Sequence, residues 1–278
     1  CRRLLALHPQ TAAAAKPPVA KLIGWMMKFQ FDNEVDYFEI DPVAYAEALG
    51  ETGMITYRSK VEQVAAHHGL EMTGDPFSGG INHLQFLLNW NAERLAVYSG
   101  DPDEVIRTHA VRRNRAAWLQ KTALALEEVG HYDVAIQWAK DAAEFDTGHQ
   151  SVDAAETWCR LLAEHRPEEL LAAREWVFFR WPNSSTATRL HAAAGEHWRD
   201  YEPQVLEKLS ISPRHSVLFV LLTLKDVEQA WHLAHELQLQ LAAGIPDADD
   251  VDTFIRDLRA AHKLRPRLQT EFDRAGLP

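Results

Sequence analysis

The segment EEVGHYDVAIQWAKDAAEF, residues 127–145, decides the fold of this chain. Gly130 separates two stretches with helical spacing of apolar residues, which predicts a tight turn between two helices. Beyond the turn, small residues recur on one side of the second helix and let a neighbouring helix approach closely. These residues are Ala135, Ala139, Ala142 and Ala143. Trp138 and Phe145 are expected to fill the groove between successive helix pairs.

The rest of the chain follows the same pattern. Apolar residues recur every three or four positions, and hardly any stretch alternates polar and apolar residues as a strand would. Breaks separate helices of about 10 to 16 residues, which is typical of antiparallel helix pairs stacked in series. The expected breaks are Gly130, 147–149, 166–167, 182–185, 202–203, 212–213, 225–226 and 242–250. The sequence therefore predicts an all-α fold, an α-solenoid of antiparallel helix pairs.

Domain organisation is indicated by one segment rich in Gly, Pro, Asp and Ser, LEMTGDPFSGG at 70–80. It predicts an N-terminal helical segment at 1–75 and a helical-repeat array at 80–278, with one continuous array as the alternative. Within the first segment, Asp41 before Pro42 predicts a helix start, and Gly50 predicts a helix stop.

The spacing of Gly130, Tyr132 and Ala135, G-x-Y-x-x-A, resembles the turn and second helix of tetratricopeptide repeats. Ala230 follows Ala135 by 95 residues (230 − 135), which fits three units of about 32 residues, close to the roughly 34-residue period. A degenerate intermediate unit lies at 166–182. The resemblance implies a tetratricopeptide-like helical repeat and is silent on function.

Five further segments carry a second resemblance. They are VAKLIGWMMKF (19–29), DPVAYAEALGETGMITYR (41–58), SGDPDEVI (99–106), LALEEVGHYDVAIQWAKDAAEF (124–145) and VFFRWPNSSTATRLHAAAG (177–195). Together they resemble the helical region downstream of the finger in bacterial SWIM zinc finger proteins. That finger needs C-x-C and C-x-H pairs as zinc ligands, and neither occurs in this chain. The resemblance implies that the finger precedes Cys1, so we expect zinc only there and no cofactor in this chain.

Composition limits the function classes. The formal charge of −11, from 29 basic and 40 acidic residues, argues against a general polyanion binder. Two cysteines, Cys1 and Cys159, cannot build a disulfide framework, so we expect a reducing, cytoplasmic setting. No stretch approaches a membrane span, and no phosphate loop, G-x-G-x-x-G or G-x-S-x-G motif occurs. The sequence does not predict an enzyme.

The candidate partner-binding residues lie in IRTHAVRRNRAAWLQK, residues 106–121, which we expect to form a basic helix. Arginine guanidinium groups could hold phosphates or an acidic peptide through bidentate contacts beside an aromatic ring. The candidates are Arg112, Arg113, Arg115 and Trp118. The alternative is that these arginines pair with acidic residues of the same chain.

Other clusters have plainer explanations. Glu228, His232 and His235 share one helix face and could offer a metal two imidazoles and a carboxylate. The spacing lacks H-E-x-x-H, so a solvated helix face is favoured and no metal is assigned. The basic run at 256–267 predicts a polar helix that caps the end of the array. The aspartates at 246–254 predict a loop that leads to a helix start. Cys159 lies in an apolar helical run, which predicts a buried, unreactive thiol.

The sequence therefore predicts a protein–protein interaction scaffold that binds a protein or peptide partner and has no catalytic activity of its own. The alternative is a nucleic-acid-associated accessory domain acting with the upstream zinc finger. A salt-dependent affinity for DNA or RNA would favour this alternative. Oligomeric state and the binding face are not indicated.

Overall fold

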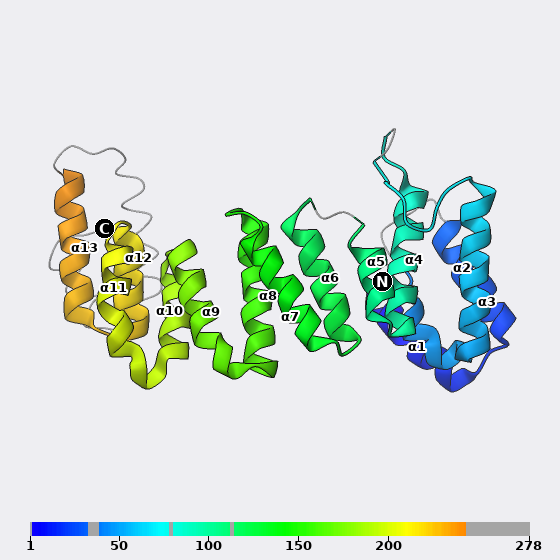
Figure 1. The fold of residues 1–278 in the computed structure, drawn as a ribbon, viewed down its shortest axis with the longest axis horizontal. Coiled ribbons are helices and arrows are strands. Elements are labelled where there is room, and N and C mark those ends of the chain that lie inside the picture. Colours follow the sequence, from blue (N-terminus) through cyan, green and yellow to red (C-terminus); the bar gives the residue numbers. More distant parts are fainter. Residues whose placement is uncertain (1, 33–38, 78–79, 112–113, 243–278) are drawn as a thin grey trace. The chain divides into compact units, whose positions relative to one another are not determined.

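The computed structural model describes residues 2–32, 39–77, 80–111 and 114–242 (Figure 1). Within these ranges the regular elements are helices and no β-strand occurs. The predicted all-α helical-repeat fold is confirmed. The chain divides into two compact units, Cys1–Leu161 and Leu162–Pro278.

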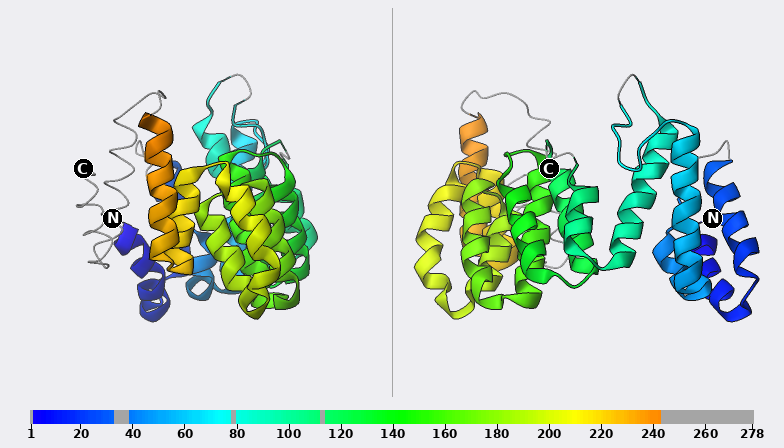
Figure 2. Two further views of the ribbon diagram at one scale, coloured as in Figure 1. Left: turned by 90° about the vertical axis from the view of Figure 1, so that its left-hand side faces the viewer. Right: turned by 45° about the vertical axis from the view of Figure 1, so that its right-hand side comes forward.

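The first unit consists of helices joined by turns or loops. In each unit, most successive helices run in opposite directions, as the views of Figure 2 show. The elements of the first unit are α1 (Arg2–Ala15), α2 (Val19–Phe31), the 3₁₀ turn η1 (Pro42–Tyr45), α3 (Ala46–His67), α4 (His83–Ser99), α5 (Pro102–His109), α6 (Ala116–Glu128), α7 (Tyr132–Glu144) and most of α8 (His149–His165).

The α6–α7 pair confirms the helix turn predicted around Gly130. Gly130 adopts φ 82°, a left-handed conformation that a residue without Cβ reaches at little cost. The four alanines predicted to face a neighbour, Ala135, Ala139, Ala142 and Ala143, are fully buried. Trp138 packs on a small core of Leu119, Ala142 and Ala154. Phe145 was predicted to fill the groove, and this is wrong: it caps α7 with 42% of its surface exposed.

Both helix signals predicted at 41–50 are confirmed, the start before η1 and the break at Gly50. The Asp41 carboxylate accepts a hydrogen bond from the Val43 backbone N–H at 3.0 Å. Gly50 has the non-helical angles φ 64° and ψ 174°, so one helix ends there, as predicted, and a second begins directly after it across a kink. The helix resumes because Met54, Tyr57 and Val61 continue an apolar face that is buried in the core.

The segment proposed as a linker forms the loop between α3 and α4. Both helices contribute to one hydrophobic core, with Tyr57 from α3 and Leu88 from α4 among its members. The Tyr57 hydroxyl also donates a hydrogen bond to the Asn91 side-chain oxygen, 2.7 Å away in the buried interior. The predicted division near residues 75–80 therefore falls inside the first unit.

The second unit holds the end of α8, α9 (Pro167–Arg180), α10 (Ser184–Ala194), the turn η2 (Gly195–His197), α11 (Trp198–Ser210), α12 (Pro213–Phe219), the π-turn η3 (Val220–Leu224) and α13 (Val227–Ala242). The predicted break at 202–203 is wrong, because α11 continues through Pro203. The chain breaks earlier, at Gly195, which adopts φ 50°. A proline removes one backbone donor from a helix, and here neighbouring contacts from Val205 and Leu209 keep α11 in the core.

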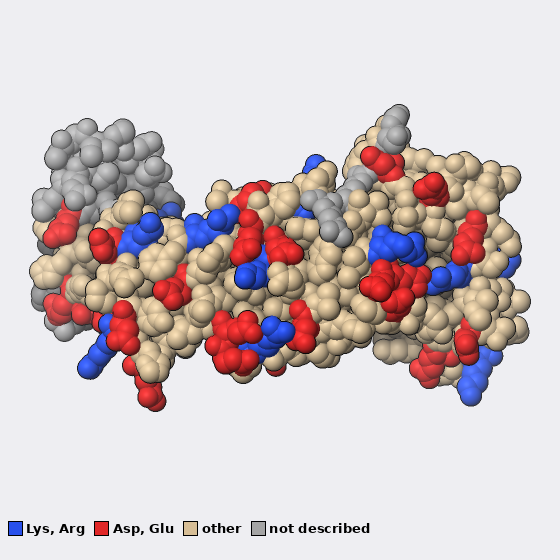
Figure 3. All heavy atoms as spheres, in the orientation of Figure 1, with Lys and Arg blue, Asp and Glu red and all other residues tan. Residues whose placement is uncertain are grey.

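The surface of the described residues mixes charges of both signs. On the face drawn in Figure 3, basic side chains mostly lie beside acidic ones in each unit. Among the helices that the structure describes, none combines the length and apolarity needed to cross a bilayer.

Candidate functional site

The predicted basic helix is interrupted. Its N-terminal part belongs to α5, which ends at His109, and its C-terminal part belongs to α6, which begins at Ala116. Arg112 and Arg113 lie outside the described residues. Arg115 is the exposed N-cap residue of α6, with an extended backbone at φ −152°. The expectation of one continuous basic helix is therefore wrong, because an extended backbone at residue 115 cannot continue a helix.

Trp118, in the first turn of α6, lies at a pocket in the first unit. The pocket has a volume of about 120 Å³. Its walls come from α4, the end of α5, the start of α6, the loop before α4 and residue 39, which precedes η1. The lining residues are Glu39, Thr73, Gly74, Pro76, Phe86, Asn89, Trp90, Glu93, Thr108, His109, Val111, Trp118 and Lys121.

The loop wall is fixed to α4 by hydrogen bonds. The Asn89 side-chain oxygen accepts from the Gly74 N–H at 3.0 Å, and its amide donates to the Gly74 carbonyl at 2.9 Å. A Cβ on Gly74 would come within 2.6 Å of Gln85 Oε1. Gln85 is itself held, donating from Nε2 to the Glu71 carbonyl at 2.8 Å. Glycine at residue 74 thus allows the loop to lie closely on α4.

Two tryptophans from different helices flank the pocket. Trp90 is oriented by its indole N–H, which donates to the Ile40 carbonyl at 2.9 Å. The ammonium group of Lys121 lies 6.0 Å from the Trp90 ring centroid and 5.6 Å from that of Trp118. These distances are within the range of cation–π attraction, so Lys121 places a cation between two indole rings.

Lys121 also pairs with Glu93, which joins α6 to α4. The Glu93 side chain is only 6% exposed, whereas that of Lys121 is 40% exposed. Burial raises the pKa of the Glu93 carboxyl, and the Lys121 ammonium and Arg94 guanidinium oppose that rise. The nearby Glu39 carboxylate adds to it. The pocket therefore contains two carboxylates and one ammonium group.

His109 is buried at the pocket, with 4% of its surface exposed. Its Nδ1 lies 3.0 Å from the Val105 carbonyl, which can only accept, so Nδ1–H is the donor and Nε2 carries the lone pair. Burial lowers the pKa of His109 to about 4, against the weaker effect of that hydrogen bond. His109 is therefore neutral at pH 7 and adds no positive charge to the segment 106–121.

Arg94, the residue after Glu93 in α4, forms ion pairs with two carboxylates. Its guanidinium group lies 2.9 Å from both carboxylate oxygens of Asp41. It also lies 2.7 and 2.6 Å from those of Glu128, so both contacts are bidentate. Arg94 therefore joins α4 to the start of η1 and to the end of α6, and its own charge is fully engaged.

The other candidate ligand groups lie elsewhere. Glu228, His232 and His235 are exposed on α13, and among the described residues they form no group of converging ligand atoms. Their position agrees with the solvated helix face that was the favoured explanation. Cys159 is fully buried in α8, as predicted.

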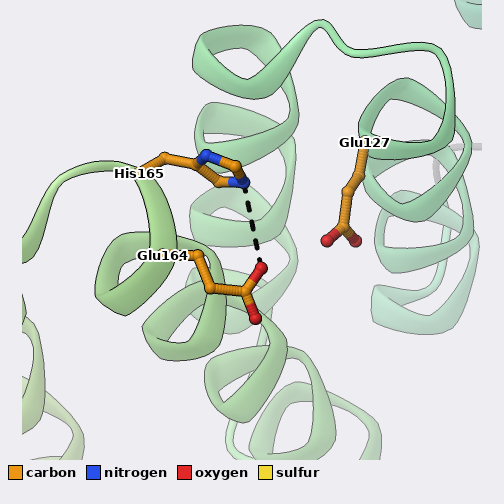
Figure 4. Close-up of side chains that lie close together, drawn as sticks. All are labelled: Glu127, Glu164 and His165. Carbon is orange, nitrogen blue, oxygen red and sulfur yellow. Dashed lines mark ion pairs between the residues drawn. The ribbon is translucent and has the colours of Figure 1, made fainter.

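Two carboxylates near helix ends, Glu127 in α6 and Glu164 in α8, each have a partner within their own unit. In the first unit, Arg160 contacts both carboxylate oxygens of Glu127, at 2.6 and 2.7 Å. In the second, His165 Nε2 lies 3.9 Å from Glu164 Oε2, an ion pair when the imidazole is protonated (Figure 4).

Comparisons with family models, curated proteins and solved structures find no match to this chain. The pocket is accordingly interpreted from its own chemistry.

Of the predicted site residues, the structure places Trp118 at the pocket and Arg115 at the exposed start of the same helix. Sequence reasoning missed Trp90 and Glu93, whereas Lys121 lies within the basic segment 106–121 that it singled out. One signal was available in the sequence: Glu93 lies close to Leu88 and Leu95, which belong to the buried apolar face of α4. An acidic residue in such a position needs a buried partner, although the sequence does not say which one.

Proposed function

We propose that this chain is a protein–protein interaction scaffold whose first unit binds one side chain of a partner protein in the Trp90–Trp118 pocket. The observation that carries the proposal is the pocket itself, in which two indole rings from different helices lie near the ammonium group of a partly exposed ion pair. Tryptophan is enriched among residues that dominate binding energy at protein interfaces.

The size of the pocket favours this function over a metabolite site. Sites for small molecules and cofactors usually enclose about 300–1,000 Å³, whereas this pocket encloses about 120 Å³. That volume suits a single side chain at the end of a larger contact surface.

The ionisable groups also favour binding over catalysis. Glu93 is paired with Lys121, and the Nδ1–H of His109 is directed to the Val105 carbonyl. A general base and a nucleophile within hydrogen-bonding reach would be expected of an acid–base site. We therefore propose no catalytic activity for this chain.

A helical-repeat interaction scaffold is also what the resemblance to the region downstream of SWIM zinc fingers implies. That family relationship, a cytoplasmic location and zinc in an upstream finger stay predictions. The nucleic-acid alternative also stays a prediction. On the face drawn in Figure 3, basic side chains mostly lie beside acidic ones, which gives this alternative no added support.

Replacing Trp118 by alanine is expected to weaken partner binding at least about tenfold, since truncating a central interface tryptophan typically costs more than about 1.4 kcal/mol. The measurement is affinity capture with the tagged full chain and quantitative mass spectrometry, followed by titration of each captured protein.

Trp176→Ala is the matched control, because Trp176 is also partly buried but belongs to α9 in the second unit. Partners of the pocket should be lost with Trp118→Ala and kept with Trp176→Ala. If every partner is kept by both variants at unchanged affinity, the pocket is not the binding site.

A further inference from the structure

We propose that the Trp90–Trp118 pocket selects a cationic side chain, a lysine or arginine of the partner, in preference to an acidic one. This inference rests on the proposed function and adds the chemistry of the side chain that is bound. It differs from the sequence-based expectation that basic residues of this region hold an acidic peptide.

Charge complementarity is the first argument. Among the described residues, the charged side chains that line the pocket are Glu39, Glu93 and Lys121, which together carry a formal charge of −1 when both carboxyl groups are ionised. One incoming cation would bring the sum to zero, whereas one incoming carboxylate would bring it to −2. In a partly desolvated site like charges disfavour one another, so the cation is favoured.

The remaining basic groups do not reverse this preference. His109 is neutral at pH 7, since burial holds its pKa near 4. Arg94 is engaged by two carboxylates, Asp41 and Glu128. Among the described residues that line the pocket, Lys121 is therefore the cation that an acidic ligand would have to use, and it already contacts Glu93.

The aromatic walls are the second argument. Indole is the best ring for cation–π attraction, and the free protein already places the Lys121 ammonium near both rings. Lys121 thus occupies the position expected for a bound cation. Its side chain is 40% exposed on a flexible stem, so its ammonium group can turn toward solvent while the partner cation takes its place as the counter-charge of Glu93.

The test uses the full chain labelled with ¹⁵N-tryptophan and two probes, the blocked tripeptides acetyl-Gly-Arg-Gly-amide and acetyl-Gly-Glu-Gly-amide. Indole N–H resonances are followed by NMR and assigned with Trp90→Phe and Trp118→Phe. We expect the arginine peptide to shift both resonances and to bind at least about fivefold more tightly than the glutamate peptide.

Two charge-removing variants sharpen the test. Glu93→Gln keeps the shape of the side chain and should weaken the arginine peptide about tenfold. Glu39→Gln, at an exposed residue, should weaken it about twofold to threefold and serves if Glu93→Gln does not fold. Glu144→Gln is the matched control, because Glu144 is exposed on α7 and absent from the pocket lining, and it should change nothing.

A preference for the glutamate peptide, no shift with either peptide, or unchanged arginine binding in both pocket variants would overturn the cation assignment. None of these results bears on whether Trp118→Ala loses partners, so failure of the assignment is distinguishable from failure of the proposed function.

Discussion

Replacing Lys121 by alanine is expected to lower the free energy of unfolding of the first unit by about 3–5 kcal/mol at pH 7, because removal of one partner leaves a buried charge without compensation. Glu93 is that charge, since its side chain is only 6% exposed. Alanine is itself a good helix former at a position inside α6, so loss of helix propensity should add little.

The pH dependence of the destabilisation by Lys121→Ala tests whether the unpaired charge of Glu93 causes it. Burial raises the pKa of the Glu93 carboxyl above its ordinary value of 4.5, so Glu93 takes up a proton more readily in the folded state than in the unfolded chain. Its contribution to stability is then present below about pH 4.5 and declines as pH rises. The destabilisation by Lys121→Ala should accordingly be smaller near pH 4 than at pH 7, since protonated Glu93 needs no ammonium partner.

Hydrogen exchange of the α4 and α6 amides as a function of urea measures this effect within the first unit. Lys140→Ala is the matched control: Lys140 pairs with Glu144 at 3.9 Å in an exposed contact, and its loss should cost about 0.5 kcal/mol or less. The double variant Lys121→Ala with Glu93→Leu should recover most of the lost stability. A loss that is equal at both pH values would contradict the role given to Glu93.

His109 is expected to make the first unit less stable in mild acid. Its folded pKa of about 4 lies below its ordinary value of 6.5, so between these values the unfolded chain binds more protons. Stability therefore rises with pH across this window and is fully present above pH 6.5. A shift of this size corresponds to about 3 kcal/mol between pH 4 and pH 7.

His109→Asn removes the titrating group while its amide can still donate toward the Val105 carbonyl. The free energy of unfolding of both proteins is measured from pH 4 to pH 7 by the same exchange method. The free energy of unfolding of His109→Asn should lack the pH dependence that comes from His109. The wild-type value should therefore approach that of the variant as pH falls from 7 to 4. Parallel curves over the whole window would show that His109 is not the group responsible.

Much of the fold is predictable because it depends on local signals. Gly130 and the alanines after it encode a turn and a close helix contact within about fifteen residues of sequence, where backbone freedom and side-chain size suffice. Pro203 was misjudged for the opposite reason. Buried side chains beyond Pro203 keep the helix going, and such packing is decided by distant segments.

The pocket was harder to predict than the fold. Trp118 stood out as an aromatic residue among basic ones, but its opposite wall, Trp90, comes from another helix. The partner of Lys121 lies 28 residues earlier in the chain. The break between α5 and α6 carries no proline or glycine, so periodicity alone extended one basic helix across it.

Site-specific photo-crosslinking measures most directly whether a partner occupies this pocket. A benzophenone amino acid is placed at Val111, which lines the pocket and is 53% exposed, and in a control protein at Ile211, which is 78% exposed in the second unit. Partners captured in a Trp118-dependent manner should crosslink from residue 111 and not from residue 211. Equal crosslinking from both residues, or crosslinking from residue 211 alone, would contradict the assignment of the Trp90–Trp118 pocket as the partner site.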